Sequence, residues 1–223
     1  QFNVITKLPV CDVNKVENIV NSSLNRLNTD SVYGYLIHNV KAVKKNNDVF
    51  YELQKIKEKG LIKKIGFSLY NTSELETLFA NKIDFNIIQV PYNLFDQRFE
   101  SYFKLLKEKN IELHIRSVFL QGLFFIKPEK LDSEFLPVKE KIKLLNDVSM
   151  KSGIPIQVLC LSFVLRNSFV DKVVIGIDGN EHLLDLLSME QKISEAFSYY
   201  DELKSLKEDN PNIILPYKWG KSE

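Results

Sequence analysis

The feature that most constrains the fold of this chain is a regular alternation of short apolar runs with longer segments of helical periodicity. Six runs have the composition of buried strands, and most are followed by apolar residues at helical spacing. The predicted strands cover residues 1–7, 33–38, 63–68, 85–90, 111–117 and 171–177, the last of which runs into a glycine-containing loop. The predicted helices cover 13–27, 49–60, 71–80, 100–110, 138–151, 155–166 and 181–207. Because no linker or change of composition interrupts this order, the sequence predicts one α/β domain with a parallel sheet over residues 1–223.

The composition excludes several classes of partner. The chain has 223 residues, of which 44% are hydrophobic and 26% charged, and its net charge is +1. This balance gives no attraction to nucleic acid or to an anionic membrane surface. Only Cys11 and Cys160 are available for disulfides, so we expect a reduced, cytoplasmic protein. The most apolar run, VLCLSFVL, is too short to span a bilayer, and we expect no membrane association.

The glycine pattern separates two parallel α/β folds. An open sheet that binds dinucleotides usually has a G-x-G-x-x-G turn after its first strand, and this sequence contains none. The alternation therefore favours a (β/α)8 barrel, although about six of the eight units are present.

Polar residues stand at the ends of five of the apolar runs. They are Lys7, His38, Ser68, Gln89 and Ser117. In parallel α/β proteins, chemistry gathers at the carboxyl ends of the strands, because the loops there vary without disturbing the sheet. We therefore expect these five side chains to open on one face.

Four stretches of the sequence, read in order, resemble the aldo/keto reductase family of (β/α)8 barrels. The stretches are SLNRLNTDSVYGYLIH, IGFSLYNTSEL, IIQVPYNLFDQRFE, and IRSVFLQGLF together with VVIGIDGNEHL. The resemblance extends from Val4 to Trp219. It implies a reductase that transfers hydride from NADPH or NADH to a small-molecule aldehyde or ketone, for which a sugar-derived carbonyl is one option.

The resemblance also assigns roles to residues in the first four strands. Lys7 matches the family's catalytic lysine, and His38 matches the histidine that orients the substrate oxygen. Ser68 and Gln89 match the positions that hold the nicotinamide carboxamide. In family members the lysine acts on a tyrosine, whose hydroxyl donates a proton at neutral pH only if a nearby cation stabilises its anion.

Later residues match the region that binds the rest of the cofactor. Ser117 and Gly176 correspond to the phosphate and ribose region, and Arg116 stands where many members stack a tyrosine on the nicotinamide. Asp178 and His182 replace the lysine and arginine that bind the 2′-phosphate in members preferring NADPH. Asp178 before Gly179 also fits simple turn chemistry.

The departures from the family pattern leave two interpretations open. The family's catalytic aspartate and tyrosine belong to two amino-terminal units that this sequence lacks, so we expect the chain to be amino-terminally incomplete. One interpretation is an NAD(P)H-dependent aldo/keto reductase; the other is an inactive domain of the same fold with a binding or scaffolding role. An incomplete barrel would expose strand edges, through which the chain could self-associate.

Overall fold

The structure, a computed structural model, describes residues 2–38, 40 and 48–220. Gln1, which belongs to a predicted strand, and Asn39, which follows the predicted strand end at His38, lie outside the described residues. The chain divides into two compact units. Unit 1 comprises Gln1–Val90 and Lys104–His114, and unit 2 comprises Pro91–Phe103 and Ile115–Glu223. The single domain over residues 1–223 stays a prediction.

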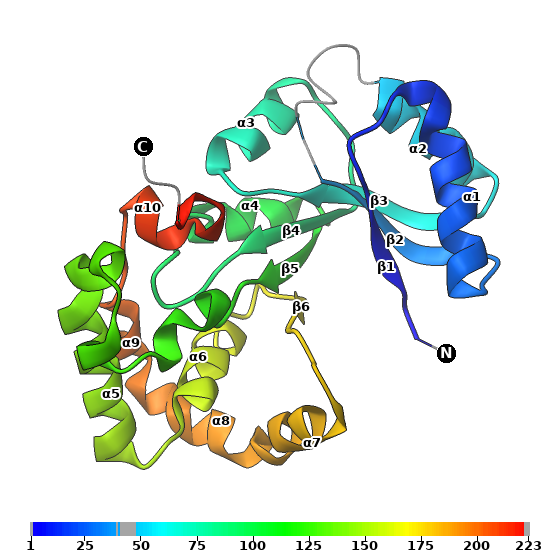
Figure 1. The fold of residues 1–223 in the computed structure, drawn as a ribbon. Coiled ribbons are helices and arrows are strands. Elements are labelled where there is room, and N and C mark those ends of the chain that lie inside the picture. Colours follow the sequence, from blue (N-terminus) through cyan, green and yellow to red (C-terminus); the bar gives the residue numbers. More distant parts are fainter. Residues whose placement is uncertain (1, 39, 41–47, 221–223) are drawn as a thin grey trace. The chain divides into compact units, whose positions relative to one another are not determined.

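Unit 1 is built on parallel strands with helices between them (Figure 1). The hydrogen-bonded strand order follows the sequence, β1-β2-β3-β4-β5-β6, as predicted. The strands that lie wholly or mainly in unit 1 are β1 (Ile5–Leu8), β2 (Val32–Ile37), β3 (Ile62–Ser68), β4 (Ile87–Pro91) and β5 (Glu112–Arg116). The helices are η1 (Val13–Lys15), α1 (Val16–Leu27), α2 (Asp48–Glu58), α3 (Thr72–Ala80) and α4 (Phe103–Glu108).

Ring and hydroxyl contacts identify the face of the unit 1 sheet that the helices cover. The hydroxyl of Tyr35 on β2 lies 2.9 Å from the hydroxyl of Ser23 on α1. The ring of Phe67 on β3 stacks on that of Phe50 on α2, with centroids 6.0 Å apart. Because successive residues of a strand point to opposite faces, the neighbours of Tyr35 and Phe67 point away from these helices.

Gly66 lies on the opposite face, in register with Ile87 of β4. A Cβ atom added to Gly66 would lie 1.8 Å from the carbonyl oxygen of Ile87, far inside any possible contact. Only glycine therefore allows β3 and β4 to approach each other as they do here.

Glu112 is the centre of a polar cluster in unit 1. Its side chain is 11% exposed and accepts hydrogen bonds from the Tyr33 hydroxyl at 2.7 Å, from Lys64 Nζ at 2.5 Å and from His114 Nε2 at 2.9 Å. Burial alone would raise the pKa of this carboxyl. The hydrogen bonds from Lys64, His114 and Tyr33 outweigh that effect and lower the pKa to about 2.

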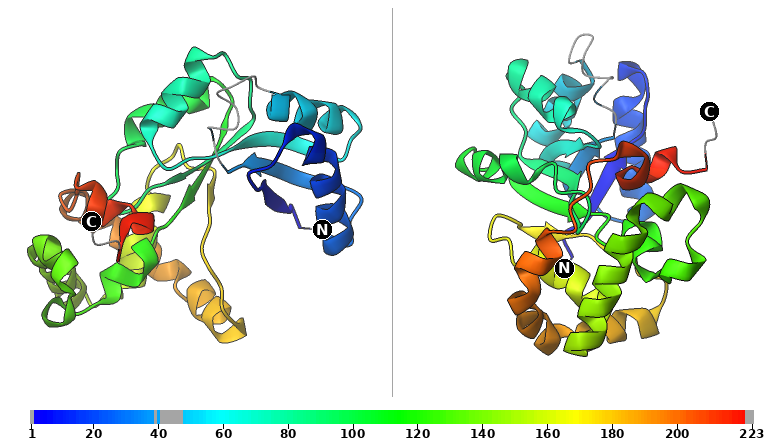
Figure 2. Two further views of the ribbon diagram at one scale, coloured as in Figure 1. Left: turned by 45° about the horizontal axis from the view of Figure 1, so that its top comes forward. Right: turned by 90° about the vertical axis from the view of Figure 1, so that its left-hand side faces the viewer.

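Unit 2 is mainly helical. α6 is buried along most of its length and packs against α5, α8 and α9 (Figures 1 and 2). The elements are η3 (Glu100–Tyr102), η4 (Leu120–Phe125), η5 (Pro128–Lys130), η6 (Ser133–Val138), α5 (Lys139–Ser152), α6 (Ile156–Leu165), β6 (Lys172–Val173), α7 (Asn180–Ser188), α8 (Glu190–Ala196), η7 (Phe197–Tyr199), α9 (Tyr200–Lys204), α10 (Pro211–Ile214) and η8 (Pro216–Lys218).

Aromatic rings hold the interior of unit 2 together. The ring of Phe163 on α6 stacks on Tyr92 at 5.1 Å and on Tyr200 at 5.4 Å. Near the carboxyl end, the indole of Trp219 packs edge to face on Phe135, with centroids 4.8 Å apart, and its Nε1 donates to the carbonyl of Ile213 at 3.0 Å. Trp219 is the only tryptophan in the sequence.

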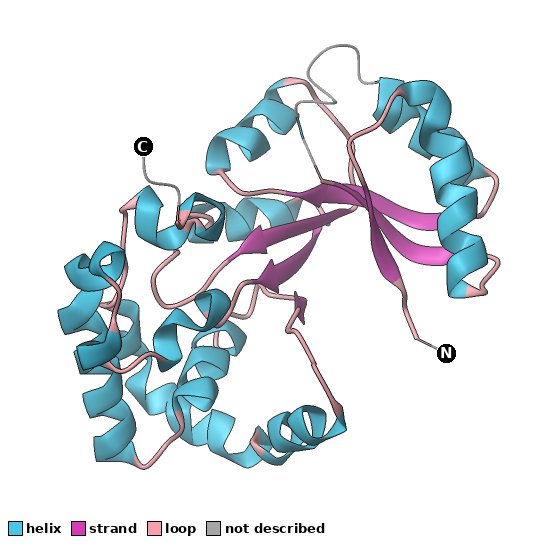
Figure 3. Ribbon diagram, in the orientation of Figure 1, coloured by secondary structure: helices cyan, strands magenta, loops and turns pink. Residues whose placement is uncertain are grey.

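Two predicted elements of unit 2 are wrong in extent. The strand predicted over residues 171–177 is reduced to β6, Lys172–Val173, and residues 174–178 have no regular structure (Figure 3). Gly176 lies within the predicted strand, and glycine disfavours extended pairing. The helix predicted over residues 181–207 is divided into α7, α8, η7 and α9. The spacing of apolar residues indicates which face of a helical segment is buried. It does not indicate where the helix axis changes direction, so the breaks between these short helices were not predicted.

No single helix within the described ranges is long and apolar enough to cross a bilayer. Ser133–Ser152 and Ile156–Leu165 together have the length and apolar composition of a membrane span, but this pair of helices is bent by 99°.

We predict that Gly66→Ala destabilises the chain by at least about 2 kcal/mol, because the new methyl group must push β4 away or strain the ladder. Gly176→Ala is the control. A Cβ atom at Gly176 would meet nothing within 4 Å, and its φ is outside the left-handed region, so its effect should stay within about 0.5 kcal/mol. Urea unfolding followed by circular dichroism measures both. Equal stability of Gly66→Ala and the unmodified chain would contradict the close approach of β3 and β4.

We predict that Glu112→Gln removes a stabilising contribution that depends on pH. The native pKa of Glu112 is lowered to about 2 from an ordinary value of 4.5, so its carboxylate stabilises the fold fully above about pH 4.5. That contribution is lost as the pH falls from about 4.5 to about 2. At neutral pH the variant should be less stable by about 1–3 kcal/mol.

The measurement is a series of urea unfolding curves between pH 7 and pH 2. Glu108→Gln is the control, since Glu108 is 60% exposed and its carboxylate lies 3.9 Å from Lys104 Nζ. The difference between Glu112→Gln and the unmodified chain should shrink on acidification, whereas Glu108→Gln should follow the unmodified chain throughout. A difference that does not change with pH would mean that packing, and not charge, is the contribution of Glu112.

Candidate functional site

Three of the predicted site residues in unit 1 point to one face of its sheet. Lys7 of β1 is in register with Leu36 of β2, which is in register with Gly66 of β3. Ser68, two residues beyond Gly66, is in register with Gln89 of β4. Because residues two apart on a strand share a face, Lys7, Ser68 and Gln89 all point away from the face covered by α1 and α2.

Ser68 and Gln89 form the buried part of this face. Ser68 is 1% exposed and Gln89 is 5% exposed. The backbone N–H of Leu69 donates to the carbonyl of Gln89 at 2.9 Å, which fixes the ends of β3 and β4 side by side. The Ser68 hydroxyl has no hydrogen-bond partner among the described residues. A buried polar group without a partner costs about 1–3 kcal/mol, so this hydroxyl is suited to a ligand.

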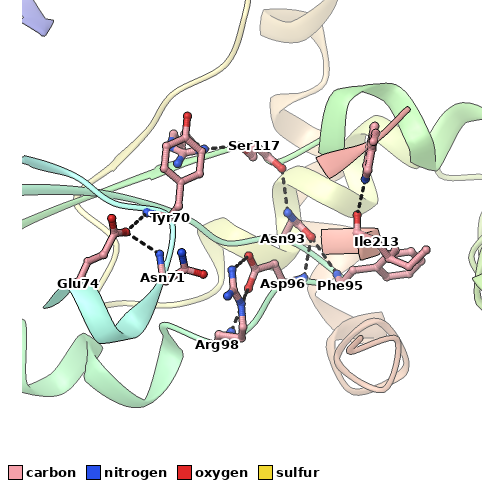
Figure 4. A network of polar contacts seen from close by, with 11 residues as sticks. Tyr70, Asn71, Glu74, Asn93, Phe95, Asp96, Arg98, Ser117 and Ile213 are labelled. Carbon is pink, nitrogen blue, oxygen red and sulfur yellow. Dashed lines mark hydrogen bonds and ion pairs between the residues drawn. The ribbon is translucent and has the colours of Figure 1, made fainter. Parts of the chain in front are cut away.

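His38 is the first residue after β2, and its side chain is exposed. Its ring lies edge to face against the ring of Tyr70, with centroids 5.9 Å apart. The backbone N–H groups of Tyr70 and Asn71 donate to the Glu74 carboxylate at 2.7 Å and 2.9 Å, and this capping box starts α3 (Figure 4). The backbone of Tyr70 is therefore fixed where its ring restricts the orientation of His38.

Tyr70 was not predicted as a site residue from the sequence. The spacing of Asn71 and Glu74 is nevertheless that of a capping box, which places the preceding residue at a fixed helix start.

Arg116 and Ser117 lie next to each other in unit 2, at the end of β5 and just after it. Arg116 Nη1 donates to the Ser117 hydroxyl at 3.0 Å. The backbone of Ser117 is left-handed, with φ 61°, which is uncommon for a residue other than glycine. Asn93 Nδ2 donates to the Ser117 carbonyl at 3.0 Å (Figure 4), a contact that was not predicted from the sequence.

The other predicted residues of unit 2 lie on or after the irregular segment that follows β6. Gly176 and Asp178 are in that segment, and His182 is in the first turn of α7. Asp178 and His182 are exposed. The structure thus brings Arg116 and Ser117 together in unit 2, and places the remaining three residues on an accessible stretch of chain.

Within the described residues, no group of three or more His, Cys, Asp or Glu side chains is arranged to hold a metal ion. The candidate site of unit 1 offers the side chains of Lys7, His38 and Tyr70 and the neutral groups of Ser68 and Gln89.

The profile of the aldo/keto reductase family matches residues 4–205 of this sequence. This match covers most of the 223 residues, and it spans both the strand ends that carry Lys7, His38, Ser68 and Gln89 and the segment that carries Arg116 to His182. The chain belongs to the aldo/keto reductase family.

Individual relatives agree with the family assignment. A Bacillus subtilis (strain 168) protein described as an uncharacterized oxidoreductase, YqkF, is 27% identical over 119 residues, which are 53% of this chain and 39% of that protein. The chain thus spans well under half the length of this curated relative.

Solved structures of aldo-keto reductases share the fold. The holo form of AKR11C1 from Bacillus halodurans superposes with a TM-score of 0.69 at 20% identity, over 91% of this chain and 70% of that chain. Tm1743, a thermostable aldo-keto reductase solved with the inhibitor epalrestat, gives a TM-score of 0.67 at 20% identity, over 92% of this chain and 71% of that chain. The predicted fold class, an α/β chain with six β/α units of an aldo/keto reductase barrel, is confirmed.

We predict that Ser68→Ala leaves stability unchanged within about 0.5 kcal/mol or raises it, because the variant removes a buried hydroxyl that has no partner. Ser23→Ala is the matched control. The Ser23 hydroxyl is also buried but is bonded to Tyr35 and to the carbonyl of Ile19, so its loss should cost about 1–2 kcal/mol. Urea midpoints of the two variants decide the matter. A loss of stability in Ser68→Ala as large as that in Ser23→Ala would show that Ser68 has a structural role.

Proposed function

We propose that this chain is part of an NAD(P)H-dependent oxidoreductase that reduces an aldehyde or ketone to an alcohol. Membership of the aldo/keto reductase family supports this class of reaction. The substrate is a small carbonyl compound, and a sugar-derived carbonyl is one candidate.

The observation that carries the proposal is the buried Ser68 hydroxyl without a partner beside Gln89, on the same face as Lys7. A hydroxyl and an amide side chain together offer donors and an acceptor, which is the set that a carboxamide requires. Ser68 and Gln89 would therefore hold the nicotinamide carboxamide. When bound, the dinucleotide supplies the hydride.

Lys7 and His38 would act on the substrate and on the proton that it receives. A carbonyl oxygen that accepts hydride must also accept a proton, and a hydroxyl donates one at neutral pH only if a cation stabilises the anion left behind. The ammonium of Lys7 would be that cation. The hydroxyl would be that of the family's catalytic tyrosine, which belongs to the amino-terminal units that this sequence lacks. His38 would donate a hydrogen bond to the substrate oxygen and orient it, with Tyr70 restricting the ring.

Residues of unit 2 would bind the phosphates and ribose of the cofactor. Ser117 and Gly176 would contact the phosphate region, and Arg116 would lie flat against the nicotinamide ring. The packing of the protein does not itself require glycine at position 176, since a Cβ atom there would meet nothing within 4 Å. A ligand passing close to the backbone would supply a reason for it.

Asp178 and His182 would set the choice between the two dinucleotides. The Asp178 carboxylate would accept a hydrogen bond from a ribose 2′-hydroxyl and repel a 2′-phosphate. No arginine stands at position 182 to compensate. We therefore propose that NADH binds at least as well as NADPH.

We predict that the chain binds a nicotinamide dinucleotide, and that Ser68→Ala and Gln89→Ala each weaken this binding by about 3–10-fold, the loss expected for one or two hydrogen bonds. Ser162→Ala is the control, because Ser162 is equally buried and its hydroxyl is bonded to the carbonyl of Leu159. NADH and NADPH are titrated at the same ionic strength, with the fluorescence of the reduced nicotinamide as the signal.

Turnover is followed as oxidation of NAD(P)H in the presence of a generic aldehyde. We expect no turnover from residues 1–223 alone, because the tyrosine that donates the proton is not in this sequence. When the two amino-terminal units are supplied, Lys7→Met should lower turnover by about 10²–10⁴-fold with little change in dinucleotide affinity, because the lysine acts on proton transfer. Absence of binding to both dinucleotides would contradict the proposal and favour an inactive binding or scaffolding domain. A clear preference for NADPH would contradict the role of Asp178.

A further inference from the structure

The segment that follows β5 in unit 2 has an unusual backbone. Ser117, Leu120 and Gln121 have φ values of 61°, 43° and 53°, and Gly122 has φ 89°. A left-handed conformation costs a non-glycine residue about 1–3 kcal/mol, so the surrounding structure must hold this turn in place. Leu120 is fully buried, which fixes the middle of the turn. Its beginning, at Ser117, needs another restraint.

Asn93 supplies that restraint. It is fully buried, and both the oxygen and the nitrogen of its amide side chain are hydrogen-bonded (Figure 4). Oδ1 accepts from the backbone N–H groups of Phe95 at 3.0 Å and Asp96 at 2.9 Å, while Nδ2 donates to the Ser117 carbonyl at 3.0 Å. The acceptor half therefore shapes the loop after β4, and the donor half reaches across to the loop after β5.

The hydrogen bond from Asn93 to the Ser117 carbonyl takes the place of a backbone hydrogen bond between the two segments. One residue earlier, the backbone N–H of Tyr92 donates to the carbonyl of Arg116 at 3.3 Å. The Asn93 amide then donates to the carbonyl of the next residue, Ser117, and so extends the ladder between the two segments beyond the point where the backbones can pair. The Ser117 carbonyl also accepts from the N–H of Leu120 at 3.0 Å.

The amide of Asn93 and the N–H of Leu120, which both donate to the Ser117 carbonyl, fix the plane of the peptide between Ser117 and Val118. Because the carbonyl and N–H of one peptide point in opposite directions, fixing the Ser117 carbonyl also fixes the direction of the Val118 N–H. The Ser117 side chain is held separately, by Arg116 Nη1 on its hydroxyl. Both the backbone and the side chain of Ser117 are thus set before any ligand arrives.

We propose that Asn93 is a positioning residue for cofactor binding. Through its single hydrogen bond to Ser117 it holds the turn of residues 117–122 in the conformation that receives the phosphates of the dinucleotide. This inference rests on the proposed function, since it gives Asn93 a purpose only if Ser117 contacts the cofactor. Asn93 itself touches no reacting group.

The chemistry of the site requires both halves of the amide. Serine at position 93 could still accept from the N–H groups of Phe95 and Asp96, as hydroxyls do in turns, but it is too short to reach the Ser117 carbonyl. Aspartate would keep the shape and the acceptor, and would replace the donor by a carboxylate oxygen that repels the carbonyl. Asn93→Ser is neutral, so it is suited to measurements with anionic ligands.

The first test is amide hydrogen exchange. Asn93→Ser should increase the exchange of residues 117–122 by tenfold or more relative to the unmodified chain, with a smaller change elsewhere in unit 2. Asn210→Ser is the matched control, because Asn210 Oδ1 likewise accepts a backbone N–H, that of Asn212 at 3.0 Å, and caps α10. If Asn93→Ser fails to fold, Asn93→Asp provides the same comparison with less loss of volume. Unchanged exchange of residues 117–122 would overturn the inference.

The second test measures affinity for NADH and for ADP, which carries phosphates and no nicotinamide. Asn93→Ser should weaken the binding of both ligands by the same factor, about tenfold, which corresponds to about 1.4 kcal/mol. Asn210→Ser should leave both unchanged, and Ser68→Ala should weaken NADH alone. Unchanged ADP affinity in Asn93→Ser would show that Asn93 is merely structural and overturn the inference. If the unmodified chain binds neither ligand, the proposed function is overturned together with the cofactor role of Asn93.

Discussion

The parallel backbone ladder from β1 to β4 is the constraint on which the rest of unit 1 depends. Its register decides which side chains share a face, because a shift by one residue would move every side chain of a strand to the other face. The side chains of Tyr35 and Phe67 point toward the helices. In this register, the side chains of Lys7, Ser68 and Gln89 therefore point to the opposite face of the sheet. The closeness that Gly66 permits between β3 and β4 keeps that register in place up to the row where Ser68 lies beside Gln89.

The sequence predicted well those features that depend on local chemistry. Short apolar runs ending in a polar residue predicted β2, β3 and β4. This worked because burial on both faces and the end of a strand each depend on the type of consecutive residues. The same signal was misleading near Gly176. Val173, Val174 and Ile175 resemble the start of a long strand, but the glycines that follow allow the chain to leave the sheet, and only β6 forms.

Contacts between residues distant in sequence could not be predicted in this way. Nothing near Glu112 indicates that Lys64 and Tyr33 will bond its carboxylate, and nothing near Asn93 indicates its bond to Ser117. Both depend on which strand ends become neighbours, which is known only once the sheet has formed. The candidate site was therefore predictable as a set of strand-end residues, whereas the groups that hold those residues in place required the structure.

The single tryptophan gives the chain a spectroscopic label that is confined to one of its two units. Trp219 lies in unit 2, where its indole is bonded to the carbonyl of Ile213 and packed on Phe135, so its emission reports the environment of that unit alone. Circular dichroism, by contrast, averages over the helices of both. If the two signals change together during unfolding, the units form one cooperative system; if the indole signal changes separately, unit 2 has a stability of its own.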